Sequence, residues 1–258
     1  MNKLIDLNSD MAEAFGAYQM GADLEIIRSI SSANIACGYH AGDPLVMDAR
    51  VKLCREHGVA VGAHPGFPDL MGFGRRNMVV TSAEARGYII YQLGALQAFA
   101  QAHGVRVEHV KPHGALYNMA AVDSKLAKAI AEAIYAVDPE CVLVALAGSE
   151  LVAAGRAVGL PVAEEVFADR GYRPDGTLVP RNEPGAIIKS VDEAVERIVR
   201  LVETGKIVAN NGQEIAVRGD TVCLHGDTPG AAEYAAAIRA RLESQGVGIR
   251  PMREVLGR

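Results

Sequence analysis

Hydrophobic and polar positions follow two different periods along the chain. Short apolar runs, several of them rich in β-branched residues, alternate with longer segments whose apolar residues recur every three to four positions. The short runs are expected strands at residues 3–8, 33–37, 59–64, 107–111, 141–147, 162–167 and 221–225. Because strands alternate with helical segments along the whole length, the pattern predicts an α/β protein with about seven parallel strands.

The ends of several expected elements can also be located. Thr81-Ser-Ala-Glu84 and Ser190-Val-Asp-Glu193 each fit a capping box ahead of an amphipathic helix. Residues 206–217 read KIVANNGQEIAV, with Asn211-Gly212 placed as in a hairpin turn. No linker, repeat or charge block marks a boundary, so we expect a single β/α-barrel domain over residues 1–258 with a hairpin excursion at 206–217.

Polar side chains gather on one face of the expected strands and at their carboxyl ends. Alternation along a strand puts the following residues on common faces: Asp6, Asn8 and Asp10; His109, Lys111 and His113; Cys223, His225 and Asp227. Other expected strands end in or near Asn34, His40, His64, Glu165, Asp169 and Arg170. In β/α barrels, catalytic groups come from the carboxyl ends of several strands, whereas an open doubly wound sheet gathers them at one switch point. The polar strand ends therefore favour a closed or nearly closed barrel.

These residue types supply the chemistry of hydrolysis. A histidine or carboxylate can act as a general base for water, and Lys111 can offset the charge of a developing oxyanion. The candidate catalytic residues are Asp10, Lys111, His113, Glu165, His225 and Asp227. The residues expected to bind or orient a substrate are Asp6, Asn8, Asn34, His40, His64, Asp169 and Arg170. Asp and His residues could also hold a divalent metal, but no H-E-x-x-H or H-x-x-E-H motif occurs, so the metal stays an open question.

A glycine-containing loop after the third expected strand carries two adjacent arginines. The stretch Gly72-Phe-Gly-Arg75-Arg76 suits an anionic carboxylate or phosphate at the mouth of the site, and both arginines are candidate substrate-binding residues. The alternative is a solvated loop with surface ion pairs. The sequence contains no G-x-x-x-x-G-K-[ST] motif, so a phosphate-binding loop of that type is not expected.

Composition and charge narrow the classes of partner. The chain has 258 residues, of which 50% are hydrophobic, and this suffices for a large core. Its net charge is −5 and its basic residues are dispersed, so a nucleic acid is not an expected partner. No signal peptide or membrane-spanning run is visible, and we expect a cytoplasmic protein that does not bind membranes. The four cysteines are far apart, so buried reduced thiols are expected, with a catalytic cysteine as the alternative.

Seven ordered stretches give the chain a resemblance to the LamB/YcsF family, the family that provides the A subunit of the bacterial ATP-dependent 5-oxoprolinase. The stretches are residues 6–10 (DLNSD), 34–44 (NIACGYHAGDP), 62–69 (GAHPGFPD), 72–76 (GFGRR), 110–118 (VKPHGALYN), 165–172 (EVFADRGY) and 225–229 (HGDTP). They extend from the first expected strand to the last. The resemblance implies a distorted seven-stranded parallel β/α barrel similar to the polysaccharide deacetylase group.

The resemblance also implies an activity. It is the cleavage of 5-oxo-L-proline to L-glutamate coupled to ATP hydrolysis, with ATP as a co-substrate and with two companion subunits, B and C. Our hypothesis is that the companion subunits phosphorylate the amide oxygen and that this chain opens the activated ring. Two other classes stay open, namely a stand-alone metal-dependent amidase or deacetylase and a non-catalytic scaffold. Assembly into a homo-oligomer is also compatible with the sequence.

The first motif departs from the family pattern. The family usually reads Asp-Leu-Asn-Cys-Asp-Leu-Gly-Glu-Gly, whereas here Ser9, Met11, Ala12 and Ala14 replace the cysteine, the leucine and the two glycines. Glycine adopts a positive φ without steric cost, and alanine does not. If either glycine position needs a positive φ, we expect the loop around Glu13 to be altered in this chain.

Overall fold

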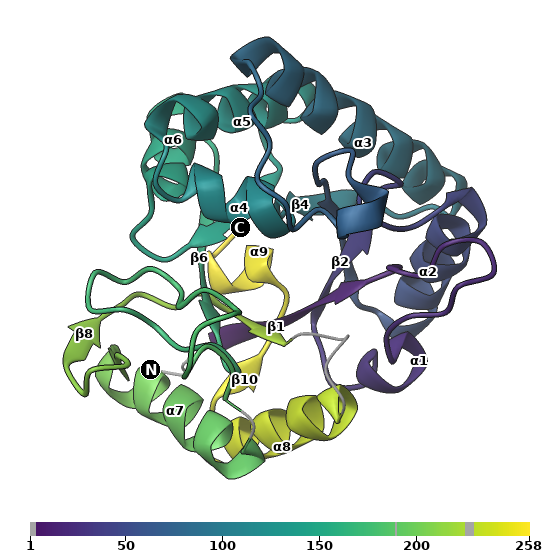
Figure 1. Ribbon diagram of the computed structural model, residues 1–258. Coiled ribbons are helices and arrows are strands. Elements are labelled where there is room, and N and C mark those ends of the chain that lie inside the picture. Colours follow the sequence, from purple (N-terminus) through teal and green to yellow (C-terminus); the bar gives the residue numbers. More distant parts are fainter. Residues whose placement is uncertain (1–3, 189, 225–229) are drawn as a thin grey trace.

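Seven parallel strands form a closed barrel in the computed structural model, which describes residues 4–188, 190–224 and 230–258 (Figure 1). The strands are β1 (Leu4–Met11), β2 (Ser32–Ala36), β3 (Ala60–His64), β4 (Val107–Val110), β5 (Val142–Leu146), β6 (Val162–Phe167) and β9 (Thr221–Leu224). Each pairs with the next in this order, and β1 also pairs with β9. This last pairing closes the sheet and confirms the barrel that the polar strand ends predicted.

Helices form a ring outside the barrel (Figure 1). The longer ones are α2 (Pro44–His57), α3 (Ser82–Ala102), α5 (Ser124–Val137), α6 (Glu150–Val158), α7 (Val191–Thr204) and α8 (Ala231–Ser244). The shorter ones are α1 (Asp23–Ile26), α4 (Gly114–Ala120), α9 (Met252–Val255) and the 3₁₀ turn η1 (Leu70–Gly72). None of the helices in the described ranges is long and apolar enough to cross a membrane.

Local chemistry explains where these helices begin. Thr81 and Glu84 form the expected capping box at the start of α3. The Ser190 hydroxyl accepts a hydrogen bond from the Glu193 amide at the start of α7. At the start of α2, Asp43 accepts from two backbone amides and Pro44 occupies the first turn, where its missing N–H is not needed.

Three further strands lie outside the seven-stranded barrel. β7 (Lys206–Val208) and β8 (Glu214–Ala216) pair antiparallel on either side of the Asn211-Gly212 turn. β10 (Gly248–Ile249) pairs in parallel with the first residues of β1. Next to β10, α9 packs Met252 against apolar residues of β5 and β6, so this helix covers the amino-terminal end of the barrel.

β1 is longer than expected and ends at a strained residue. It runs to Met11, three residues beyond the expected end at Asn8, because Asp10 and Met11 continue the pairing with β2. The next residue, Ala12, has a φ of 62°, a conformation that favours glycine. A glycine position of the family motif therefore does have a positive φ here, and alanine adopts it.

The barrel encloses polar side chains, whereas most of the apolar core lies between the strands and the surrounding helices. Residues such as Leu7 and Val110 point outward into that apolar layer. The inward positions of the same strands, and the position directly after β4, carry buried polar groups: Asp6, Asn8, Asn34, His109, Lys111, Glu165 and Thr221. Charged groups are seldom fully buried unless they are paired, so their partners reveal what this interior does.

Candidate active site

Lys111 lies at the centre of a buried ion-pair network. Its Nζ is 2.9 Å from Asp10 Oδ1, 2.9 Å from Glu165 Oε1 and 3.0 Å from Cys223 Sγ. Burial alone would lower the pKa of Lys111, but Asp10, Cys223 and Glu165 together raise it well above its ordinary value. Lys111 is therefore a fixed positive charge inside the barrel.

A layer of amides and hydroxyls supports this network. Asn8 donates to Glu165 Oε1 at 3.0 Å, and Asn34 donates to Asp10 Oδ1 at 2.8 Å. The Tyr117 hydroxyl donates to Glu165 Oε2 at 2.7 Å. Both Glu165 oxygens are thus engaged, which makes this carboxylate a support for Lys111 rather than a group directed at a substrate.

Asp6 lies deeper still and does not border the cavity. It accepts hydrogen bonds from Ser31, Ser32 and Thr221. Burial raises the pKa of Asp6 to about 6, although these hydrogen bonds act in the opposite direction. The structure therefore does not bring Asp6, Asn8 or Asn34 to the substrate side, where the strand pattern predicted them.

His64 and His113 present lone pairs to each other. His64 Nδ1 is 2.7 Å from the Lys111 carbonyl oxygen, and His113 Nε2 is 2.8 Å from that of Phe73. Because a carbonyl only accepts, both of these nitrogens carry the hydrogen. The remaining nitrogens, His64 Nε2 and His113 Nδ1, are 3.0 Å apart, and in neutral rings both are acceptors. Two acceptors at this distance require a proton or a metal cation between them.

Glu13 and His40 complete a compact group with these two histidines. Glu13 Oε1 is 3.5 Å from His40 Nε2 and 3.6 Å from His113 Nδ1, and the ligand atoms of all four residues lie within 4.8 Å of one another. Burial lowers the pKa of His40 and of His113 well below the ordinary value, so both rings are neutral and offer lone pairs. Donors that share one zinc ion lie about 3.4 Å apart, and histidine with carboxylate is a usual zinc set. The group fits a divalent cation.

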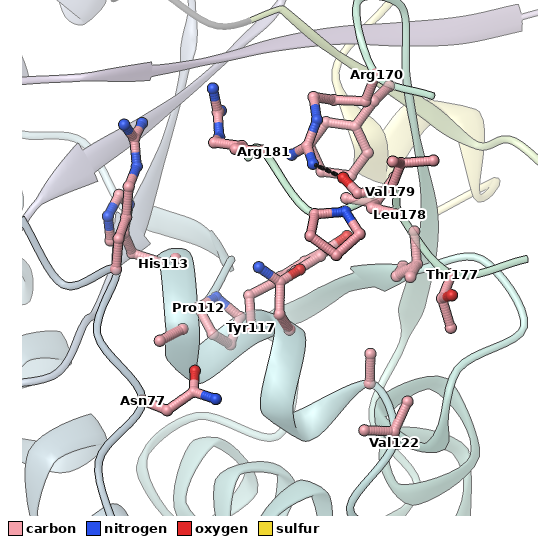
Figure 2. Close-up of a pocket in the computed structure, with 18 of the residues that line it drawn as sticks. Asn77, Pro112, His113, Tyr117, Val122, Arg170, Thr177, Leu178, Val179 and Arg181 are labelled. Carbon is pink, nitrogen blue, oxygen red and sulfur yellow. Dashed lines mark hydrogen bonds between the residues drawn. The ribbon is translucent and has the colours of Figure 1, made fainter. Parts of the chain in front are cut away.

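A cavity of about 710 Å³ opens above these residues (Figure 2). Asp10, His64, Lys111 and His113 border it, together with Tyr117 and Asn118 of α4. Much of the remaining wall comes from the segment between β6 and α7: Arg170, Arg173, Asp175, Thr177, Leu178, Val179, Pro180, Arg181 and Asn182. The expected catalytic residues Asp10, Lys111 and His113 therefore meet at one cavity.

The two adjacent arginines have different environments. Arg75 borders the cavity, with its guanidinium 4.8 Å from the centre of the Phe73 ring. Arg76 instead forms an ion pair with Asp69 of its own loop and does not line the cavity. The prediction that Arg76 binds a substrate anion finds no support in the structure, because a local carboxylate already occupies its guanidinium.

The other expected site residues fall into three groups. Arg170 reaches the cavity wall, but its guanidinium donates to backbone carbonyls of Val179 and Ala186. Asp169 is buried beside it and does not border the cavity. His225 and Asp227 lie outside the described residues.

All four cysteines are free and buried, as expected. Burial raises the pKa of Cys37 to about 12 and that of Cys223 well above its ordinary value. Neither thiol is therefore ionised near neutral pH, and a cysteine nucleophile is not supported.

Several residues of the site were not among those predicted from the sequence, and Glu13, Tyr117 and Arg181 matter most to its chemistry. Glu13 follows the strained Ala12, and its place in the first motif was the available signal. Tyr117 stands in the matched stretch 110–118, where its α-helical position hides the contact with Glu165. Arg181 lies in an irregular segment, and no periodic pattern pointed to it.

Fold and site together define a β/α-barrel protein with a hydrolytic set of residues at the carboxyl ends of its strands. The LamB/YcsF family model matches residues 5–257, and the chain belongs to this family, as its motifs predicted. It is 55% identical over 252 residues to the 5-oxoprolinase A subunit of Alkaliphilus metalliredigens (strain QYMF), covering 98% of each chain.

Solved structures resemble the chain at two levels. A lactam utilization protein from Thermus thermophilus superposes with a TM-score of 0.91 at 48% identity, over 96% of this chain and 99% of that one. A peptidoglycan N-acetylglucosamine deacetylase superposes with a TM-score of 0.50 at 12% identity, over 98% of this chain and 88% of that one. The second likeness concerns the fold alone, and it confirms the expected similarity to the polysaccharide deacetylase group.

Proposed function

We propose that this chain is the A subunit of a 5-oxoprolinase and opens the ring of 5-oxo-L-proline to give L-glutamate. One observation carries the proposal: Asp10, Lys111 and the paired histidines His64 and His113 converge on the floor of a single cavity. A relative that bears the name of the 5-oxoprolinase A subunit, similar over nearly the whole chain, supports the choice of substrate.

Ring opening adds water to the lactam carbonyl carbon, breaks the carbon–nitrogen bond and gives the nitrogen a proton. Lys111 supplies a positive charge that stabilises negative charge developing on the substrate oxygen. Asp10 takes the proton from the attacking water. Its Oδ1 accepts hydrogen bonds from Lys111 and Asn34, so the proton is assigned to its Oδ2, which lies 3.3 Å from His64 Nε2. Glu165 and Asn8 keep Lys111 in position and do not exchange protons with the substrate.

The proposal assigns the ATP-dependent step to the companion B and C subunits. A lactam is a poor electrophile, and phosphorylation of its amide oxygen makes the ring carbon easier for water to attack. The absence of a phosphate-binding P-loop motif from this sequence supports that division of labour. This chain then opens the activated ring: one water adds to the ring carbon and the carbon–nitrogen bond breaks with a proton delivered to the nitrogen. A second water converts the resulting acyl phosphate into the carboxylate of glutamate and inorganic phosphate.

We also propose a divalent cation as part of the site, held by Glu13, His40, His64 and His113. When bound, such an ion polarises a carbonyl group and lowers the pKa of water. The facing lone pairs of His64 and His113 support it, because they need a cation between them. The same group of residues favours a second candidate function, a metal-dependent amide hydrolase or deacetylase that acts alone.

Glutamate release from 5-oxoproline and ATP tests the proposal. We would assay this chain alone, the companion subunits alone and the mixture, and we expect glutamate only from the mixture. If no combination releases glutamate although the proteins are folded and the complex has formed, the 5-oxoprolinase proposal fails. The metal-dependent hydrolase would then become the leading candidate.

A further inference from the structure

The segment between β6 and α7 forms a wall of the cavity and carries several cationic side chains. It folds back on itself through isolated antiparallel bridges between Arg170 and Ile187 and between Tyr172 and Leu178. Arg170 and Arg181 lie on one side of the cavity in Figure 2, opposite His113 and Asn77. The wall therefore faces the residues that perform the chemistry.

Arg170 fixes the shape of this wall and does not face a substrate freely. Its guanidinium is buried, and it donates to the carbonyl oxygens of Val179 at 2.6 Å and Ala186 at 3.1 Å. Gly171 adds two backbone hydrogen bonds, donating to Ala186 O and accepting from Val179 N. These contacts hold the chain on both sides of Arg181, so its position at the cavity is set by the fold.

Unlike Arg173 and Arg76, Arg181 pairs with no carboxylate among the residues that the structure describes. Arg173 of the same segment pairs with Glu183 at 2.8 Å, and Arg76 pairs with Asp69. The Arg181 side chain makes neither an ion pair nor a hydrogen bond with any residue that the structure describes. A guanidinium with five donors directed at a cavity is suited to a planar anion, which it can bind through two parallel hydrogen bonds.

Positive charge also accumulates around Arg181. Burial, together with the charges of Arg181 and Arg75, lowers the pKa of Arg170 to about 10, while Asp169 and Tyr172 act in the opposite direction. An anion bound between these groups would relieve their mutual repulsion. Because the chain as a whole carries a net charge of −5, this attraction for anions is a local property of the cavity.

We propose that Arg181 binds the carboxylate of the substrate and thereby selects lactams that carry one. The inference rests on the proposed function, since 5-oxo-L-proline bears a carboxylate next to its ring nitrogen. A five-membered lactam fills only part of a cavity of about 710 Å³, so an anchor away from the reacting amide is needed to hold the ring over Lys111. Arg181 thus determines which substrate binds and takes no part in bond cleavage.

Calorimetric titration of the full chain tests this assignment without any need for turnover. The titrants are 5-oxo-L-proline, the uncharged lactam of the same ring size, and inorganic phosphate. We expect Arg181→Gln to weaken binding of 5-oxo-L-proline about tenfold or more and to leave the uncharged lactam unchanged. Arg181→Lys should recover part of the affinity, because it restores the charge without the two-pronged geometry.

The matched control is Arg241→Gln, which removes an exposed arginine on α8 that does not border the cavity. It should leave the affinity for every titrant unchanged. Equal affinity for 5-oxo-L-proline in the unsubstituted chain and Arg181→Gln would overturn the inference, as would no binding to the unsubstituted chain. Loss of phosphate binding alone in Arg181→Gln would also overturn it, because the group bound would then be a phosphate.

Measurements of turnover distinguish a failure of this inference from a failure of the proposed function. In the mixture with companion subunits, Arg181→Gln should raise KM for 5-oxo-L-proline and largely preserve kcat. If the mixture releases no glutamate while the titrations behave as expected, the proposed reaction fails and the carboxylate site stands. If glutamate is released and the titrations show no effect of Arg181→Gln, the reaction stands and the site is wrong.

Discussion

Ala12 is a residue whose backbone conformation conflicts with its side chain. Its φ of 62° lies in the left-handed region, which costs an L-residue other than glycine roughly 1 kcal/mol. The conformation persists because the Ala12 amide donates to Asp23 and because the following Glu13 is held in the histidine group. The strained backbone of Ala12 thus helps to orient the Glu13 carboxylate toward the histidine group.

Ala12→Gly should therefore stabilise the protein. We expect the free energy of unfolding to rise by about 0.5–1 kcal/mol, since glycine removes the strain but loses more entropy on folding. Urea unfolding followed by circular dichroism measures the change. Ala14→Gly is the control, because Ala14 is buried in the same loop but has no positive φ, and it should not stabilise. Equal effects of the two substitutions would contradict the explanation.

Lys111→Met should abolish activity and weaken the fold, because it leaves Asp10 and Glu165 without their shared cation. Breaking a buried ion pair on one side costs about 3–5 kcal/mol. The double variant Lys111→Met with Glu165→Gln removes one stranded charge and should recover part of the stability but no glutamate release. Activity in either folded variant would show that Lys111 does not stabilise the developing charge.

Asp6 should make the stability depend on pH in a known direction. Its folded pKa of about 6 lies above the ordinary 3.8, so the folded state binds a proton more tightly than the unfolded state. The resulting stabilisation is present below about pH 4 and is lost as pH rises through 6. Asp6→Asn lacks this dependence, so between pH 4 and 7 its stability should gain about 2 kcal/mol relative to the unsubstituted chain. A difference that stays constant over this range would contradict the raised pKa.

At the scale of elements, strands and helices were predictable because their periods are simple. Alternation in β1 and β4 correctly predicted that Asp10, Lys111 and His113 share the inward side of the barrel. The same alternation could not show how far inside the barrel each side chain lies. Asp6 shares the face of Asp10, but at about 3.3 Å per residue it lies roughly 13 Å back along the strand, away from the cavity.

The irregular segments explain what the sequence could not show. Arg75 and Arg76 are adjacent in the chain, yet one borders the cavity and the other pairs with Asp69, a choice that depends on the turn at η1. Arg181 reaches the site through bridges and side-chain contacts to backbone carbonyls, which leave no repeating pattern. Such tertiary contacts determine the position of most residues in the cavity wall that faces the substrate.

Gly171→Ala should disturb that wall specifically. A Cβ at Gly171 would lie 2.1 Å from the carbonyl oxygen of Gly185, so the segment must move. We expect KM to rise several-fold and the free energy of unfolding to fall by about 1–3 kcal/mol. Gly87→Ala is the matched control in α3, where the added methyl meets open space; it should stabilise by up to about 1 kcal/mol and leave KM unchanged. An unchanged KM in Gly171→Ala would show that this wall does not contribute to substrate binding.

At the scale of the whole molecule, a bound cation would link the site to global stability. A metal at one hundred times its Kd stabilises the folded state by about 2.7 kcal/mol, or roughly 5–10 °C in Tm for a chain of this size. We therefore expect a chelator to lower Tm and added Zn²⁺ to restore it. His40→Gln removes one ligand and should reduce this response. A Tm that ignores both chelator and Zn²⁺ would argue against the metal.

The closure of the barrel has a consequence for how the protein is made. The residues Asp6 to Ser9 of β1 pair with Thr221 to Leu224, and Leu4 and Ile5 pair with residues 248 and 249. The first strand therefore leaves the ribosome more than two hundred residues before its last partners. Until then, the strand that carries Asp6, Asn8 and Asp10 has only its β2 edge to pair with. The hydrolytic site can form only after synthesis is nearly finished, so a nascent chain carries no active barrel.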